Sequence, residues 1–163
     1  YCCEVGDRLA KKSDKPINYA GIAIKGLLFH YKPTKATVTV DGKTATYEKV
    51  WLAPTMNGRY YGGGMEVAPA QDRLNAAREQ SVVVMYGSGK LKTLIVFPSI
   101  FKGEHIKHTE MVAVMEGHEM TVKFDRPVAL QIDGELVLNV TEYTVRSAEA
   151  SAGKPEEAVS AEA

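Results

Sequence analysis

The chain has 163 residues, enough for one domain that buries roughly 70% of the surface its unfolded form exposes. Its 20 basic and 20 acidic side chains cancel, which excludes a strong overall field for recruiting nucleic acid or anionic lipid and leaves only local patches open. No apolar run reaches the roughly 18 residues of a membrane span, and the adjacent cysteines Cys2 and Cys3 fit a reducing, cytoplasmic compartment.

Residues 1–32 are expected to form two helices, "YCCEVGDRLAKK" and "NYAGIAIKGLLFHYK", separated by a break at "SDKP". In the second segment, apolar and aromatic residues recur at near-helical intervals, and Pro33 ends the pattern. The start at Tyr1, without an initiator Met, is expected of a fragment cut from a longer protein.

Residues 35–146 are mostly strand-like, which predicts an α+β domain that is mostly β. Two alternating runs flank Asp41-Gly42, the strongest short hairpin signal. Further strands are predicted in "VWLAPTMN", "GGMEVAP", "SVVVMY", "EMVAVM", "EMTVKF", "VALQID" and "ELVLNVTEYTV". One further helix is expected near residues 90–102, with Pro98 bending or ending its first half. Residues 147–163 contain a single large apolar residue and predict a disordered tail, so the domain covers residues 1–146.

Three consecutive glycines, Gly62, Gly63 and Gly64, stand within "NGRYYGGGMEVAP", a stretch otherwise built of strand-forming and aromatic residues. Glycine inside a strand loses packing and has a large backbone entropy to lose on folding. The usual reason for accepting it is that something passes close to the main chain.

Two other motifs favour structural interpretations. "GSGK" at residues 87–90 lacks the first glycine of a phosphate loop and has Leu91 after the lysine, which favours a strand-to-helix turn. His105 and His108 in "GEHIKH" have no nearby residues to complete a zinc site, which favours a loop pair without metal. The "NVT" at Asn139 is formally a glycosylation sequon, without consequence in the cytosol.

Asp133-Gly134, between two apolar runs, is first of all a second hairpin turn. The Asp133-Gly134 pair differs from Asp41-Gly42 because Glu135 follows it. One carboxylate therefore stands on each side of Gly134. Such a pair can take a proton from a hydroxyl or hold a metal-bound phosphate. These residues alone leave both readings open.

The order of "NGRYYGGGMEVAP", "GEH" at 103–105 and "DGE" at 133–135 resembles the C-terminal domain of the diacylglycerol kinase-like lipid kinases. That superfamily includes sphingosine kinases and, more distantly, NAD kinases, and the match runs from about Val50 to Val145. The resemblance implies a β-sandwich-like domain from a two-domain enzyme. Its N-terminal half, which carries the "GGDGT" motif that holds ATP, is missing from this chain.

The resemblance also implies residue roles. Asp133 corresponds to the general base, and Glu135 to a neighbour of the nucleotide. Asn57 and the three glycines would lie at the substrate cleft. Related kinases hold a divalent ion with a loop that contains an Asp-Gly pair. In this chain Ala77-Arg78 stands at the place of that pair. Asp72, earlier in the same loop, is the candidate for a displaced metal ligand.

The function expected from this resemblance is transfer of the γ-phosphoryl group of ATP to the hydroxyl of a diacylglycerol-like lipid, with Mg²⁺ sharing the charge. The expected location is cytoplasmic and peripheral at the membrane, and the chain by itself is expected to be inactive. Its expected partners are the lipid at the membrane surface and the missing kinase domain, without nucleic acid; a homodimer is left open. The alternative is a β-sandwich module without catalytic activity, which would be a lipid-binding or a regulatory domain.

Overall fold

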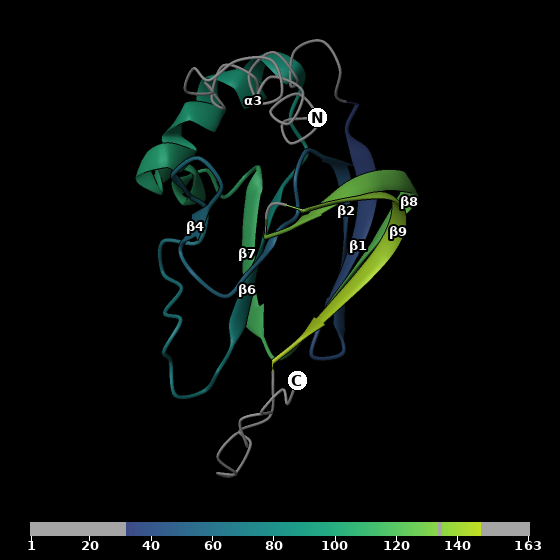
Figure 1. Ribbon diagram of the computed structural model, residues 1–163. Helices are drawn as coiled ribbons and strands as arrows, with labels where there is room; N and C mark the ends of the chain where they lie inside the picture. The colour runs from purple at the N-terminus through teal and green to yellow at the C-terminus, as the bar shows by residue number, and fades with distance from the viewer. Residues whose placement is uncertain (1–31, 134, 148–163) are drawn as a thin grey trace, which may run out of the picture.

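The computed structural model describes residues 32–133 and 135–147 (Figure 1). The expected N-terminal helices and the expected tail lie outside this part, apart from Lys32 and Ser147. The elements, in chain order, are β1 (Thr34–Val40), β2 (Lys43–Val50), β3 (Thr55–Met56), β4 (Tyr60–Tyr61), β5 (Met65–Glu66), β6 (Gln80–Met85), α3 (Lys90–Val96), the 3-10 helices η1 (Phe97–Lys102) and η2 (Glu104–Lys107), β7 (Val112–Gly117), β8 (Glu119–Ile132) and β9 (Glu135–Arg146).

Strand β6 is buried on both of its faces. Its sequence, QSVVVM, is almost entirely apolar, and all its residues after Gln80 are buried. Because successive side chains of a strand point to opposite faces, Val82 and Val84 face one layer, while Val83 and Met85 face the other. The strand predicted in "SVVVMY" is confirmed, and its continuous apolar character is explained by burial on both faces.

The described strands form two antiparallel sheets and a small hairpin. The sheets have the orders β2-β1-β8-β9 and β3-β6-β7, and β4 pairs with β5. One core cluster fills the space between the sheets and contains Ala36, Val38, Val40, Val50, Val82, Val84, Met120 and Val122. The second cluster covers the other face of β6 with residues that include Val67, Val96, Ile100 and Met111. The result is a sheet-on-sheet sandwich with the helices against one outer face (Figure 1).

Several predicted features are confirmed. Asp41 and Gly42 have φ values of 46° and 80° and connect β1 to β2, as a two-residue hairpin turn requires. The α-helical turns of the helix near residues 90–102 end before Pro98, and the chain continues as η1. "GSGK" is the turn between β6 and α3, because the helix begins at Lys90.

Other strand predictions were wrong in extent. "EMTVKF" and "VALQID" are not two strands but parts of β8, and the register with β9 shifts between Lys123 and Val128. Pro127 falls within this irregular stretch, where a missing backbone N–H is tolerated. "VWLAPTMN" contains three strand residues, Val50 at the end of β2 and Thr55 and Met56 in β3, and "GGMEVAP" contains two, in β5.

The three glycines are not inside a strand, as was predicted, but connect β4 to β5. Gly63 and Gly64 have φ values of 73° and 84°, a region that favours glycine. A Cβ added at Gly62 or Gly64 would meet no heavy atom within 4 Å. Turn geometry therefore explains Gly63 and Gly64, and neither turn geometry nor crowding by the described residues accounts for Gly62.

None of the helices in residues 32–133 and 135–147 has the length and apolarity that a membrane crossing requires.

Candidate functional site

The tip of the β8–β9 hairpin carries the two carboxylates singled out in the sequence. Ile132 pairs with Glu135, and Asp133 has a φ of 47°, so Asp133 lies in the hairpin turn. Both acidic side chains are exposed. Neither makes a hydrogen bond or an ion pair with another residue of the described part of the chain.

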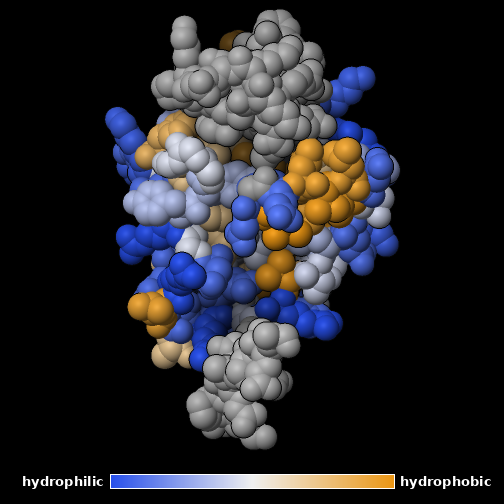
Figure 2. All heavy atoms as spheres, viewed as in Figure 1, coloured by the Kyte–Doolittle hydropathy of each residue, from blue (hydrophilic) through white to orange (hydrophobic). Residues whose placement is uncertain are grey.

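The strands beside this tip present an apolar surface. Leu130 pairs with Val137, and alternation along β8 places Ile132 on the same side of the hairpin as Leu130. Ile132 and Val137 are 55% and 43% exposed, and Leu138 is 56% exposed. Figure 2 shows this apolar surface as the hydrophobic area over the β8–β9 hairpin. The combination suits an amphipathic ligand or partner, with its polar group at the tip.

The β4–β5 hairpin carries the predicted cleft residues Asn57, Gly62, Gly63 and Gly64. Asn57 precedes β4, and its side chain is exposed. No hydrogen bond or ion pair within the described residues joins Asn57 to Asp133 or Glu135. The assignment of these residues to a substrate cleft therefore stays a prediction.

His105, the last residue of "GEH", lies against the "GGGMEVAP" segment. Its imidazole is fully buried, and Nε2 lies 2.9 Å from the carbonyl oxygen of Val67. A carbonyl oxygen only accepts, so Nε2 carries the hydrogen and donates it. Burial lowers the pKa of His105, which favours the neutral ring. Nδ1 is also buried and has no hydrogen-bond partner within the described residues.

Gly103 allows the same two segments to meet closely. It has a φ of 65°, and an added Cβ would lie 2.9 Å from Cβ of Pro69 and 3.1 Å from Oε2 of Glu66. The chain therefore needs glycine here for both conformation and space. The sequence indicated His105 as half of a metal-free loop pair and as part of the "GEH" motif, and neither pattern predicted this contact. The order of the motifs was the one signal that could have suggested it.

The loop of residues 72–79 is closed by its own side chains. Oδ1 of Asp72 accepts a hydrogen bond from the backbone N–H of Leu74 at 3.0 Å. Oδ1 of Asn75 accepts one from the N–H of Glu79 at 3.0 Å, and its Nδ2 donates to the carbonyl oxygens of Asp72 and Glu79. Among the described residues, no three His, Cys, Asp or Glu side chains gather at a metal-binding distance. The assignment of Asp72 as a metal ligand stays a prediction.

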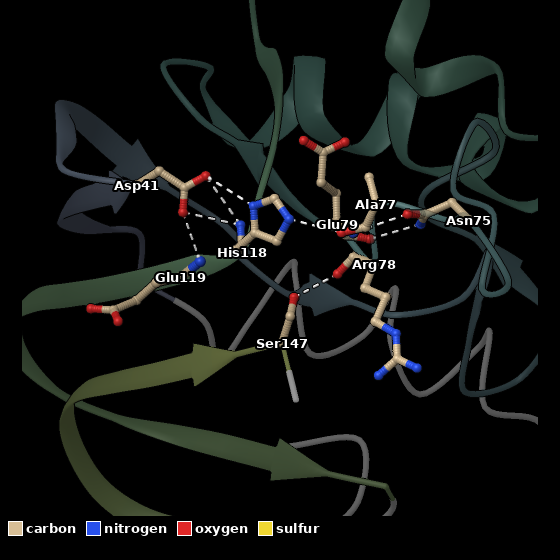
Figure 3. A network of polar contacts seen from close by, with 8 residues as sticks. All are labelled: Asp41, Asn75, Ala77, Arg78, Glu79, His118, Glu119 and Ser147. Atoms are coloured by element: carbon tan, nitrogen blue, oxygen red, sulfur yellow. Dashed lines mark hydrogen bonds and ion pairs between the residues drawn. The ribbon is translucent and has the colours of Figure 1, made fainter. Parts of the chain in front are cut away.

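A polar network fastens this loop to the sandwich (Figure 3). Nε2 of His118 donates to the carbonyl oxygen of Ala77 at 2.8 Å, and the hydroxyl of Ser147 donates to the carbonyl oxygen of Arg78 at 2.6 Å. Arg78 has a φ of 54°, a left-handed conformation that is uncommon for residues other than glycine.

The carboxylate of Asp41 lies at the other end of this network. It accepts hydrogen bonds from the backbone N–H groups of His118, at 3.0 and 3.1 Å, and Glu119, at 2.8 Å (Figure 3). These backbone donors, Glu119 first and then His118, lower the pKa of Asp41. Gly117 leaves room for the carboxylate, since an added Cβ would lie 2.5 Å from Oδ2 of Asp41. Asp41 is therefore a structural anchor, whereas Asp133 is free of such contacts.

Comparison with known proteins places these features in a family. Residues 5–148 match the family described as the YegS C-terminal NAD kinase beta sandwich-like domain. A 90-residue stretch is 29% identical to "Diacylglycerol kinase" of Mycobacterium tuberculosis, and a 109-residue stretch is 27% identical to "Putative lipid kinase YtlR" of Bacillus subtilis. These matches cover 55% and 66% of the chain, but only 28% and 34% of the relatives. The chain thus spans about a third of the length of these relatives.

Solved structures agree with the fold. Two structures titled as putative diacylglycerol kinases from Bacillus anthracis str. Sterne superpose with TM-scores of 0.57 and 0.58, at 12% and 14% sequence identity. The superpositions cover 80% and 86% of this chain, and 44% and 46% of those chains. At such low identity, the likeness confirms the mostly β, sandwich-like fold and nothing further.

Proposed function

The chain belongs to the YegS C-terminal NAD kinase beta sandwich-like domain family, and from this premise we propose that it is the second half of an ATP-dependent lipid kinase. The complete enzyme would transfer the γ-phosphoryl group of ATP to the hydroxyl of a diacylglycerol-like lipid. It would work in the cytoplasm, peripherally at a membrane, where that lipid is found.

The observation that carries this proposal is the exposed carboxylate pair of Asp133 and Glu135 at the tip of an apolar hairpin. A lipid hydroxyl has the matching character, because a polar group is joined to apolar chains. The names of the relatives support the same reaction class, since they are called diacylglycerol kinase or lipid kinase. The missing part of the enzyme would supply the "GGDGT" motif that holds the nucleotide.

In the proposed reaction Asp133 acts as the general base. The hydroxyl oxygen of the lipid forms a bond to the γ-phosphorus, and its proton passes to the Asp133 carboxylate. The bond between the γ-phosphorus and the bridging oxygen breaks, and ADP leaves with that oxygen. Asp133 is exposed and has no partner among the described residues, so its carboxylate could approach a substrate hydroxyl. The carboxylate of Asp41 could not, because it is hydrogen-bonded to the backbone of His118 and Glu119.

Mg²⁺ fits this donor set in part. Magnesium commonly binds one or two carboxylates and completes its shell with water and substrate phosphates. Glu135 and Asp133 provide carboxylates of this kind, although the described residues contain no complete metal cage. When bound, the ion would neutralise charge on the phosphoryl oxygens. Glu135 would hold it or lie beside the nucleotide, and the remaining ligands would come from outside the described residues.

The test is Asp133→Asn in the complete gene product, measured as lipid-dependent ATP turnover. Loss of a general base typically lowers the rate by about 10²- to 10⁴-fold, equivalent to roughly 3 to 5 kcal/mol of barrier. The melting temperature should hardly change, because Asn also accepts the positive φ of the turn. Glu142→Gln, which removes an exposed carboxylate from β9 of the same hairpin, is the control and should keep near-normal turnover.

Equal turnover in Asp133→Asn and Glu142→Gln would remove Asp133 from the mechanism. A second test uses the 163-residue chain alone, which should fold and show no ATP-dependent lipid phosphorylation. Activity of the isolated chain would contradict the two-domain proposal. A folded complete protein that binds lipid but never turns over ATP would favour the alternative, a non-catalytic lipid-binding or regulatory module.

A further inference from the structure

Asn57 and Gly58 link two anchored points of the chain. On one side, the buried Met56 ends β3 and takes part in its pairing with β6. On the other side, the carbonyl oxygen of Arg59 accepts a hydrogen bond from the backbone N–H of Ala68 at 3.1 Å. The two linking residues belong to no strand, and we call them the 57–58 link.

The 57–58 link itself is not held by the rest of the described chain. The side chain of Asn57 is exposed, and its amide has no hydrogen-bond partner among the described residues. The backbone N–H of Gly58 likewise has no acceptor in the part of the chain that the structure describes. Segments that lack such bonds move most easily, so the amide carbon of Asn57 and the nitrogen of Gly58 can approach each other.

The two other asparagines of the described residues are placed differently. Both polar atoms of the Asn75 amide are engaged. Its Nδ2 donates to the carbonyl oxygens of Asp72, at 2.7 Å, and Glu79, at 3.0 Å, and its Oδ1 accepts from the N–H of Glu79 at 3.0 Å. Asn139 lies inside β9, and a β-branched residue follows it and crowds the next backbone nitrogen. Among the described asparagines, only Asn57 combines an unheld amide with a following glycine.

We infer that Asn57 is a site of spontaneous deamidation. The backbone nitrogen of Gly58 gives up its proton to hydroxide and forms a bond to Cγ of Asn57. The bond from Cγ to Nδ2 breaks, and the departing nitrogen takes a proton from water and leaves as ammonia. The product is a five-membered succinimide ring, and glycine permits this closure best because it has no Cβ and the widest range of backbone conformations.

Water then opens the ring at either of its two carbonyl carbons. Cleavage between the ring nitrogen and Cγ leaves aspartate at position 57. Cleavage between the nitrogen and the main-chain carbonyl carbon leaves isoaspartate, in which the main chain runs through the side-chain carboxyl group. Both products add a negative charge, and isoaspartate also lengthens the backbone between the anchored Met56 and Arg59. The reaction requires only the chain and water, so it does not depend on the proposed function.

The experiment is timed incubation of the folded 163-residue chain in mildly alkaline buffer, followed by proteolytic peptide mapping with mass spectrometry. The acid form should accumulate at Asn57, while Asn75 and Asn139 stay amides. Isoaspartyl methyltransferase with labelled S-adenosylmethionine should label the aged chain and leave the fresh chain unlabelled. A synthetic peptide of residues 53–62 gives the rate without a fold, and the folded chain should react within roughly tenfold of it, because nothing in the described chain restrains the link.

The matched control is Gly58→Ala. The φ of Gly58 is not positive, and an added Cβ would meet no described heavy atom within 4 Å, so the variant should fold and melt as the fresh wild type does. Its Cβ hinders ring closure and should slow the loss of ammonia by roughly tenfold or more.

The inference is overturned if Asn57 stays an amide in the folded chain while the synthetic peptide converts. It is also overturned if Gly58→Ala reacts as fast as the wild type, or if Asn75 and Asn139 convert as fast as Asn57. A complete gene product that deamidates at Asn57 but phosphorylates no lipid would contradict the proposed function and keep this modification site.

Discussion

Nε2 of His105 lies 2.9 Å from the carbonyl oxygen of Val67, and this hydrogen bond joins two motifs that are 38 residues apart in the chain. Val67 follows the triple-glycine hairpin directly, and His105 ends the "GEH" sequence. The neighbouring Gly103 lies against Pro69 and Glu66. The corner between η1 and η2 therefore holds the segment that leaves the β4–β5 hairpin.

His105→Leu should destabilise the chain by about 1 to 3 kcal/mol, because the buried carbonyl of Val67 loses its donor. His105→Gln keeps a side-chain N–H donor of similar reach and should recover a large part of this loss. Urea unfolding of the three proteins measures the difference. Equal midpoints for the Leu variant and the wild type would show that the hydrogen bond does not contribute to stability.

Acid should also act through His105. Burial lowers its pKa in the folded state below the ordinary value of 6.5, so the unfolded chain binds a proton more readily. The stabilisation present above about pH 6.5 should be lost progressively as the pH falls toward the folded-state pKa. The free energy of unfolding should consequently fall more between pH 7.5 and pH 5 for the wild type than for His105→Gln. Identical pH profiles would contradict this assignment.

Asp41→Asn should lower the melting temperature, whereas Asp133→Asn should leave it almost unchanged. Turn sequence alone predicts that both variants are tolerated. The structure contradicts that symmetry, because the Asp41 carboxylate accepts hydrogen bonds from the N–H groups of His118 and Glu119. Its pKa is lowered from 3.8, so this stabilisation is present above about pH 3.8 and is lost as the pH falls through the folded-state pKa. Differential scanning calorimetry of both variants checks the contrast, and equal melting would refute it.

Gly63→Val and Gly64→Val should each destabilise by at least about 1 kcal/mol, because φ values of 73° and 84° are strained for a β-branched residue. Gly62→Ala is the matched control. Its φ is not positive and the space around its Cβ is open, so that variant should melt close to the wild type. Wild-type melting of both Val variants would show that the turn adapts without cost.

Tyr143→Phe should destabilise by about 1 kcal/mol, because the hydroxyl of Tyr143 donates to the carbonyl oxygen of Ala53. Since that hydrogen is used, Oγ1 of Thr55 donates to the same hydroxyl, at 3.2 Å. Burial raises the pKa of Tyr143 to about 12. Ultraviolet titration of the wild type should show one tyrosine that ionises near that value and is absent from the variant. Tyr60→Phe, at a side chain 65% exposed, is the control and should change neither property.

Local features of the fold could be predicted from the chain because they depend on neighbours in sequence. Asp41-Gly42 and the turn at Asp133 adopt positive φ values that few other residues accept, so each pattern predicts its hairpin. Pro98 lacks a backbone N–H donor, so the end of the α-helical turns was also predictable. The family resemblance depended equally on short motifs in order, and the family match confirms it.

Contacts between distant residues were beyond such patterns. Asp41 and Asp133 have the same local sequence, but only Asp41 meets the backbone of residues 77 positions later. His105 is buried because a segment 38 residues earlier covers it, and no spacing within "GEHIKH" encodes that. β8 continues through Asp125, Arg126 and Pro127 because its neighbours in the sheet supply the pairing on either side of the shift in register. The sequence by itself determined where the chain turns, since turning depends on the φ values that each residue accepts. Only the tertiary structure decided which turn is anchored and which carries free carboxylates, since that depends on the hydrogen-bond donors that folding brings within reach.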